Sequence, residues 1–260
     1  MPILMCPVCR KTLHKDGSSC VCANGHRFDF AKEGYLNLLL STQHRSRTPG
    51  DAPELVRARR AFLDAGYYAD LREWVAERVS GGIVLDACCG EGYYTAAAAQ
   101  KAESMYGFDI AKDAVRYAAK RDKQTTYFVA GLHAVPVQSD SADMLLHLFA
   151  PFADGEFRRI LKPGGTLLHV LPGERHLWGL KSVLYDAPYR NREIPPRTSL
   201  TLQKTERLRY TVTLRTPEDI QNLFSMTPYC YKTSPAAAAR LHALDTLETE
   251  LDFILLTYKN

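Results

Sequence analysis

The sequence predicts an α/β fold in which a Rossmann-like domain, a parallel sheet covered by helices, follows a small cysteine-rich module. The prediction rests on three features: clustered cysteines and a histidine near the N-terminus, strand-like segments alternating with helical ones from residue 83, and a glycine-containing turn after the first of those strands. Such alternation is typical of parallel sheets, which bind ligands at the carboxyl ends of their strands.

The first segment has the ligand spacing of a metal knuckle. Cys6 and Cys9 enclose two residues and can present two thiolates to one ion, so a second pair must come from Cys20, Cys22 or His26. Cys22 and His26 flank Ala-Asn-Gly, a turn that can bring both side chains to one point, and we therefore expect zinc at Cys6, Cys9, Cys22 and His26. A redox-active pair is the alternative, but that motif is expected beside a strand–helix unit. Four protein ligands would make this zinc structural, with no part in catalysis.

The length of 260 residues suits one large domain with an appendage. We expect a zinc-binding module at residues 1–40, a basic linker and helical segment at residues 41–82, and the Rossmann-like domain at residues 83–260. The sequence contains neither a signal-peptide pattern nor a run of about 18 apolar residues, which predicts a soluble cytoplasmic protein without membrane contact. The seven cysteines are not spaced like a disulfide framework, in agreement with a reducing compartment.

Positive charge is concentrated near the N-terminus. Residues 1–66 hold ten Lys or Arg against six Asp or Glu, and the remaining residues hold 23 of each, so the formal excess of +4 lies in the first quarter. Five arginines cluster there: Arg45, Arg47, Arg57, Arg59 and Arg60. They are candidates for phosphate contacts, and a solvated helix face is the alternative. Tyr35 is a further candidate for the same binding surface, although its apolar surroundings favour packing against the main domain.

The first strand of the main domain runs into LDACCGEGYYT, a turn suited to a nucleotide-like cofactor. Gly90 and Gly92 let the chain turn tightly and let a ligand reach the backbone. The three-glycine dinucleotide fingerprint is incomplete, and Asp86 would place negative charge near a pyrophosphate. S-adenosylmethionine (SAM) has no phosphate and carries an ammonium and a sulfonium group. Asp109, at the end of the second strand, is placed to accept hydrogen bonds from ribose hydroxyls, so we expect SAM here.

Several segments taken together resemble one protein family. The zinc knuckle, FDFAKEGYLNLL, ARRAFLDAGYY, the glycine turn, the Ala-Pro-Phe segment and PGERHL are similar to bacterial large-subunit ribosomal RNA guanine-N1-methyltransferases over nearly the whole chain. The resemblance implies a SAM-dependent enzyme, usually dimeric, whose zinc module recognises RNA and which methylates one guanine in a hairpin of 23S rRNA. It implies the same four zinc ligands, and contacts to SAM from Tyr68, the Gly90–Glu91 turn and His176.

The segment after the fourth strand is the expected place for the target base. Pro151 and Phe152 stand where base-modifying methyltransferases hold their substrate, and Phe152 either stacks on the guanine or packs in the core. Guanine N1 lies on the Watson–Crick edge, so the base must be unpaired or flipped out. No residue is identified as the acceptor of the N1 proton. His147 and His169, inside apolar strands, are expected in the core.

Cys88 departs from the usual Asp-x-Gly-x-Gly-x-Gly loop because it takes the place of the first glycine. Its Cβ penalises a positive φ, which predicts a slightly rearranged loop or a lower cofactor affinity.

Two other functions stay open. A methyltransferase for a small metabolite would work without RNA, and a non-catalytic zinc-dependent RNA-binding protein would tolerate the loss of SAM binding.

Overall fold

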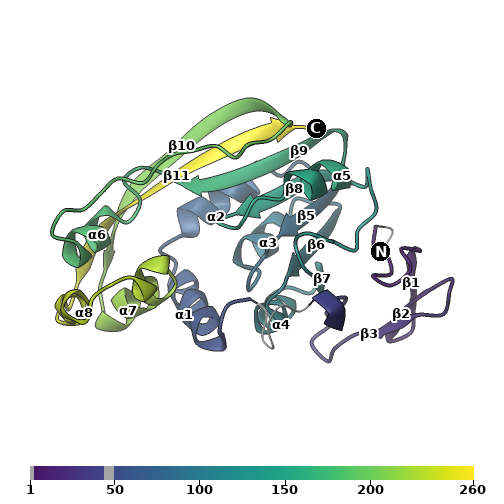
Figure 1. Cartoon of the computed structure of the whole chain (residues 1–260), viewed down its shortest axis with the longest axis horizontal. Helices are drawn as coiled ribbons and strands as arrows, with labels where there is room; N and C mark the ends of the chain where they lie inside the picture. Colours follow the sequence, from purple (N-terminus) through teal and green to yellow (C-terminus); the bar gives the residue numbers. More distant parts are fainter. Residues whose placement is uncertain (1–2, 44–49) are drawn as a thin grey trace.

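The computed structural model describes residues 3–43 and 50–260. Within them an eight-stranded sheet has the order β10-β11-β9-β8-β5-β6-β7-β4, and a three-stranded antiparallel sheet lies near the N-terminus (Figure 1). The α/β fold class is confirmed. The strands of the large sheet are β4 Leu36–Asn37, β5 Ile83–Ala87, β6 Ser104–Asp109, β7 Thr126–Val129, β8 Ala142–Leu148, β9 Leu161–Pro172, β10 Thr201–Leu214 and β11 Leu247–Lys259.

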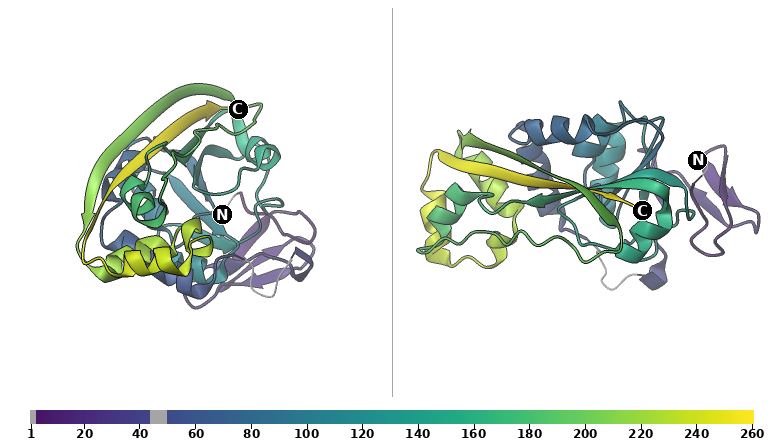
Figure 2. Two further views of the ribbon diagram at one scale, coloured as in Figure 1. Left: turned by 60° about the vertical axis from the view of Figure 1, so that its left-hand side comes forward. Right: turned by 90° about the horizontal axis from the view of Figure 1, so that it is seen from above.

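The first six of these strands, β4 to β9, are parallel, and β11 pairs antiparallel with both β9 and β10. The long strands after residue 199 therefore complete the sheet. The two last strands extend well beyond the parallel part (Figure 2). The α-helices are α1 Pro53–Asp64, α2 Ala69–Ala76, α3 Tyr93–Ala98, α4 Lys112–Arg121, α5 Asp154–Ile160, α6 Trp178–Leu184, α7 Pro217–Ser225 and α8 Pro235–His242.

Alternating side chains of the central strands feed two buried clusters, one on each face of the sheet. Val84 of β5 belongs to the cluster that includes residues of α1, α2, α3 and α7, whereas its neighbour Leu85 belongs to the cluster with α5 and the N-terminal module. This period of two is the geometry of a strand that is buried on both faces. Helices α1–α3 and α6–α8 thus cover one face of the large sheet. Helix α5 and the zinc module cover the other face.

The zinc module contains the strands β1 Leu13–Asp16, β2 Ser19–Cys22 and β3 Arg27–Asp29. It lies at one end of the molecule, and α6–α8 lie at the other (Figure 1). Its first residues dock on the loop after β7, where the Met5 amide donates to the Pro136 oxygen at 2.8 Å and the Gln138 amide donates to the Ile3 oxygen at 2.8 Å. Residues 36–37 then enter the large sheet as β4. The three-part division at residues 40 and 82 remains a proposal.

The helices follow local sequence signals. The Thr216 hydroxyl caps α7 by accepting from the Asp219 amide at 3.1 Å. The chain leaves α1 through Gly66, whose φ of +87° suits a glycine after a helix. Among the described residues, no helix is long and apolar enough to cross a membrane.

Candidate active site and zinc centre

Two tight turns bring the four expected zinc ligands together. The Arg10 amide donates to the Cys6 oxygen at 2.9 Å, and the Gly25 amide donates to the Cys22 oxygen at 2.9 Å, which closes the expected Ala-Asn-Gly turn. The ligand atoms of Cys6, Cys9, Cys22 and His26 all lie within 4.8 Å of one another.

The donor set fits zinc in kind and in spacing. Cys9 Sγ lies 3.5 Å from Cys22 Sγ, and His26 Nδ1 lies 3.6 Å from Cys6 Sγ and 3.4 Å from Cys22 Sγ. These lengths match the edges of a tetrahedron around an ion with bonds of about 2.0 to 2.3 Å. Three thiolates and one imidazole leave no position for water or substrate, so the centre is structural. Cys20, on the same strand as Cys22, is not part of this cluster.

At the carboxyl end of β5 the glycine turn is closed by hydrogen bonds of the chain itself. The Asp109 carboxylate accepts from the Gly90 amide at 3.0 Å and from the Ala111 amide at 2.8 Å. A Cβ at Gly92 would lie 2.8 Å from the Cβ of Ala118, so α4 requires a glycine there. A Cβ at Gly90 would meet no atom within 4 Å, which leaves the outer side of the turn open to a ligand.

Cys88 has a φ of +62°, so the conformation for which the usual loop has a glycine is retained here by a cysteine. The expected backbone penalty is therefore present, at about 1 kcal/mol for an L-residue in this region. The glycines of the turn share the left-handed conformation, with φ of +55° at Gly90 and +79° at Gly92.

Two acidic side chains are buried under this turn. The Thr95 hydroxyl donates to Asp86 at 2.6 Å, and burial raises the pKa of Asp86 to about 7, against the lowering effect of that hydrogen bond. Glu91 is only 3% exposed, its pKa is raised by burial, and its Oε1 has no hydrogen-bond partner among the described residues. An open backbone cradle with buried carboxylates suits a cofactor that carries positive charge and no phosphate.

Tyr68, just before α2, and His176, after β9, meet although 108 residues separate them. The Tyr68 hydroxyl lies 3.2 Å from His176 Nε2, and the Asp252 amide donates to His176 Nδ1 at 3.3 Å. Burial lowers the pKa of His176 to about 3. The imidazole is therefore neutral at physiological pH, with Nδ1 as acceptor and Nε2 carrying the proton.

Beside this pair stands Phe149, the first residue after β8. It has a φ of +56°, its ring is stacked 6.5 Å from that of His176, and it is 42% exposed. A large aromatic ring held in a strained conformation at a strand end, with one face in solvent, is suited to stacking on a base. The sequence places Phe149 directly before Ala-Pro-Phe, but the apolar run of β8 conceals its exposure.

The Ala-Pro-Phe segment contacts two histidines, His147 of β8 and His169 of β9. His147 Nε2 donates to the Pro151 oxygen at 3.1 Å, and His147 Nδ1 lies 2.8 Å from His169 Nδ1. Both histidines are buried, which confirms them as core residues, and burial lowers the pKa of His147 to about 3 and that of His169 to about 4. Phe152 is half-buried with its ring edge-on to both, at 5.8 Å and 5.2 Å, while Pro151 is exposed.

The described arginines of the N-terminal cluster all have acidic partners. Arg57 pairs with Glu54 at 2.9 Å, Arg59 with Asp51 at 2.6 Å and Arg60 with Asp64 at 3.3 Å. These pairs favour a solvated helix face over free phosphate-binding groups. Arg45 and Arg47 lie outside the described residues. Tyr35 is 4% exposed and packs in the core, as its apolar surroundings predict.

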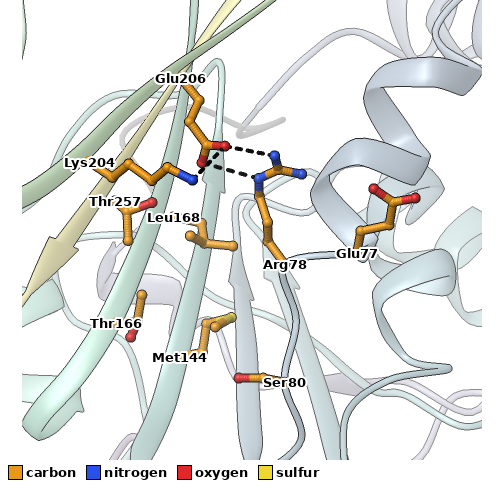
Figure 3. Close-up of a pocket in the computed structure, with 9 residues that line it drawn as sticks. All are labelled: Glu77, Arg78, Ser80, Met144, Thr166, Leu168, Lys204, Glu206 and Thr257. Atoms are coloured by element: carbon orange, nitrogen blue, oxygen red, sulfur yellow. Dashed lines mark hydrogen bonds and ion pairs between the residues drawn. The ribbon is translucent and has the colours of Figure 1, made fainter.

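A cavity of about 480 Å³ lies at the opposite, amino edge of the parallel strands (Figure 3). It is lined by Ser80 before β5, Met144 of β8 and Thr166 of β9, among others. Arg78 and Glu206 pair across its opening at 2.8 Å. The cavity is separate from the glycine turn, and its arginine is already neutralised.

Two separate parts of the chain match family models. A model described as RlmA, N-terminal, matches residues 4–47, and a model described as a methyltransferase domain matches residues 84–165. A phosphoethanolamine N-methyltransferase of Haemonchus contortus, solved with SAM, has a TM-score of 0.50 and 15% identity, covering 96% of this chain and 71% of that one. That likeness shows the shared fold.

Two curated relatives are more similar in sequence. A 23S rRNA (guanine(748)-N(1))-methyltransferase of Streptomyces fradiae is 38% identical over 191 residues, or 70% of this chain and 67% of that protein. A protein of Micromonospora griseorubida, provisionally named a 23S rRNA (guanine-N(1))-methyltransferase, is 31% identical and covers 94% of this chain and 92% of its own length. With its zinc ribbon and its SAM-dependent methyltransferase domain, the chain belongs to the 23S rRNA (guanine-N1)-methyltransferase family.

Proposed function

We propose that the protein transfers the methyl group of SAM to N1 of a guanine in a hairpin of 23S rRNA. The names of the relatives support the nucleobase and the RNA. The observation that carries the proposal in this chain is the juxtaposition of an open glycine turn, the Tyr68–His176 pair and the exposed Phe149 at one edge of the sheet.

The cofactor-binding residues are proposed as Tyr68, Asp86, Gly90, Glu91, Gly92, Asp109 and His176. Bound SAM supplies an activated methyl group, so the chain has to place the nucleophile in line with it. Asp109 retains lone pairs for ribose hydroxyls while its backbone bonds hold the turn. The unpaired Oε1 of Glu91 and the buried Asp86 provide the negative charge that a cationic cofactor requires.

The target guanine would lie against Pro151 and Phe152, the residues proposed for the catalytic edge, with Phe149 added as the exposed ring. The hydrogen bond from His147 fixes the Pro151 carbonyl, and Phe152 anchors the turn through its packing. Phe149 would stack on the base from the solvent side. The neutral His176 positions Tyr68 and is not the acceptor of the N1 proton, because both of its ring nitrogens are engaged.

Outside the reaction centre, Cys6, Cys9, Cys22 and His26 would hold one structural zinc ion, and the zinc module would recognise the RNA. We also propose that the protein is a homodimer, as the family resemblance implies. Light scattering would test this. With an rRNA substrate, the enzyme would act in the cytoplasm.

The test is methyl transfer from labelled SAM to a 23S rRNA hairpin fragment, with free guanosine as a second substrate and reverse transcription to map the product. A methyl group at N1 blocks base pairing and stops the transcript one nucleotide before the guanine. Turnover of guanosine at the rate of the hairpin would favour a small-metabolite enzyme. Binding of RNA with no affinity for SAM would favour the non-catalytic RNA-binding protein.

A further inference from the structure

Residues 186–200, with the sequence DAPYRNREIPPRTSL, connect α6 to β10 without a helix or a strand. We call this segment the strap. It runs from the α6 end of the molecule toward α5 and β10 (Figure 1 and Figure 2). Irregular segments of this length in a compact domain are usually functional or disordered, so what holds this one in place is informative.

A buried lysine fixes the first half of the strap. The Lys181 ammonium group donates to the Tyr189 oxygen at 3.1 Å and to Asn191 Oδ1 at 2.6 Å, and Lys181 is 0% exposed. The Asn191 side chain donates from Nδ2 to the Gly173 oxygen at 2.8 Å, and its backbone amide donates to the Glu174 oxygen at 2.9 Å. No carboxylate of the described residues pairs with Lys181, so oxygens of the strap itself offset the cost of burying its charge.

The second half is fixed beside α5. The Thr198 hydroxyl donates to the carboxylate of Asp154, the first residue of α5. Leu200 is buried in the same cluster as Phe157 of α5 and Leu4 of the zinc module. The C-terminal end of the strap and the zinc module therefore pack on the same face of the sheet, and α5 lies between them (Figure 1).

Between these two anchors the side chains alternate, as in any extended chain. Asn191 and Glu193 face the body of the protein, where Glu193 accepts from the Glu174 amide at 2.6 Å and pairs with Arg207 at 2.5 Å. Arg192, between these two residues, and Ile194, after them, are exposed to solvent. The exposed fraction of Ile194 is 68%. The consecutive prolines at 195 and 196 further restrict the backbone.

Two arginines of the strap are exposed without an acidic partner within residues 3–43 and 50–260: Arg192 and Arg197. Arg190 differs, since it pairs with Glu174 at 3.2 Å. The described arginines of α1 are also paired, because each has a carboxylate within 3.3 Å. A guanidinium group that is exposed, unpaired and carried by a fixed backbone is suited to bind a phosphate without first breaking an ion pair.

We propose that the strap is a second RNA-binding surface, on which Arg192 and Arg197 contact backbone phosphates next to the target guanine and Ile194 covers an apolar face of an unpaired nucleotide. The proposal rests on the proposed function, because it takes rRNA as the substrate. Lys181 and Asn191 are positioning residues that hold the strap. RNA bound by the zinc module would pass α5 and the Ala-Pro-Phe segment to reach it.

The test compares wild-type protein with the double variant Arg192→Ala/Arg197→Ala in binding to the 23S hairpin fragment at several salt concentrations. Two lost phosphate contacts should lower the slope of log affinity against log salt by about two. The KM for RNA should rise about tenfold, while kcat and SAM affinity stay the same. The double variant Arg192→Lys/Arg197→Lys should retain most of the slope, since the slope depends on the number of positive charges that neutralise phosphates.

Lys101→Ala is the matched control, because this exposed cation follows α3 on the opposite face of the sheet and forms no ion pair within the described residues. It should leave the salt slope unchanged. Lys181→Met tests the positioning role: it should loosen the strap, seen as faster amide exchange at residues 189–192, and raise the KM for RNA without affecting SAM binding. Retained SAM affinity shows that this variant is folded.

The proposal is overturned if wild-type protein methylates the hairpin and the double alanine variant has the same salt slope and KM. It is equally overturned if the double variant is impaired only on assembled ribosomal particles, which would make the strap a protein-binding surface. Failure of the wild type to methylate any rRNA would instead contradict the proposed function, and the salt slope would still report on the strap.

Discussion

The zinc module and the cofactor turn are both tight loops of small residues, but they are held in different ways. In the module, three thiolate sulfurs and an imidazole nitrogen converge within 4.8 Å, an arrangement that needs a cation to be stable. At the turn, Asp109 of the same chain binds the Gly90 amide, and it also binds the Ala111 amide just before α4. We therefore expect the module to depend on its ion for its shape, whereas the cofactor turn is held by hydrogen bonds of the chain itself.

The module is nevertheless continuous with the main domain. Ile3 and Leu4 are 2% and 0% exposed in the cluster under α5, and β4 pairs with β7 of the large sheet. Loss of the ion should thus disorder β1–β3 first and leave residues 3–5 and 36–38 protected by the sheet.

The largest effect is expected from Cys9→Ala. Removing one ligand should release zinc, whose binding contributes on the order of 10 kcal/mol to the folding of small zinc modules. Amide exchange at residues 13–29 should become fast, while SAM affinity changes little. Mass spectrometry under native conditions measures the zinc content, and hydrogen exchange measures the protection of the amides. Cys20→Ala, a buried cysteine outside the cluster, is the control and should keep its zinc. Zinc release with β1–β3 still protected would show that the module folds without the ion.

The cofactor turn should respond most to Asp109→Ala. The variant loses the acceptor for the Gly90 amide and for the ribose, so SAM binding should weaken by about 1 to 3 kcal/mol. Calorimetry provides the measurement, and zinc content should stay the same. Asp109→Asn, which keeps one acceptor oxygen, should fall between the alanine variant and the wild type. An unchanged SAM affinity in both would place the ribose elsewhere.

A smaller effect is expected from pH. The pKa of Asp86 is raised by burial to about 7, above its unfolded value, so its protonated form stabilises the apoprotein at low pH, and this stability is lost as pH rises toward 7. Cationic SAM should favour the ionised form, so its affinity at pH 6 should be about tenfold below that at pH 8. Calorimetric titrations between pH 6 and 8 measure this dependence. If the profile persists in Asp86→Asn, another group is responsible.

The smallest effect is expected from Cys88→Gly, which relieves the positive φ of this residue. The gain in stability should be no more than about 1 kcal/mol, because glycine also increases the entropy of the unfolded chain. Thermal unfolding of the apoprotein would detect it. Cys89→Gly is the contrasting variant: Cys89 is buried, and its loss should destabilise the protein. A lower stability of Cys88→Gly would mean that the thiol contributes packing that outweighs the backbone penalty.

Much of this protein can be predicted from local sequence. The zinc ligands follow from the spacing of Cys6 and Cys9 and from the turn between Cys22 and His26, because ligand pairs within a few residues are positioned by the turn itself. The strands from β5 onward follow from apolar runs, and the position of Asp109 follows from its place at a strand end. Each of these features is decided by residues that are close in the chain.

Other features depend on parts of the chain that meet only in the folded molecule. The Tyr68–His176 hydrogen bond joins residues 108 positions apart, and the exposure of Phe149 depends on how β8 ends against Phe253 of β11. The arginines of α1 are an exception, because their acidic partners lie on the same helix or just before it, so the pairing is local in the chain. The strap has no periodic pattern to predict, and its position is fixed by the buried Lys181 and by Asp154. Local turns and periodicity thus determined the ligands and the strands, whereas the tertiary structure decided which side chains share the edge of the sheet, since those contacts are long-range and depend on packing.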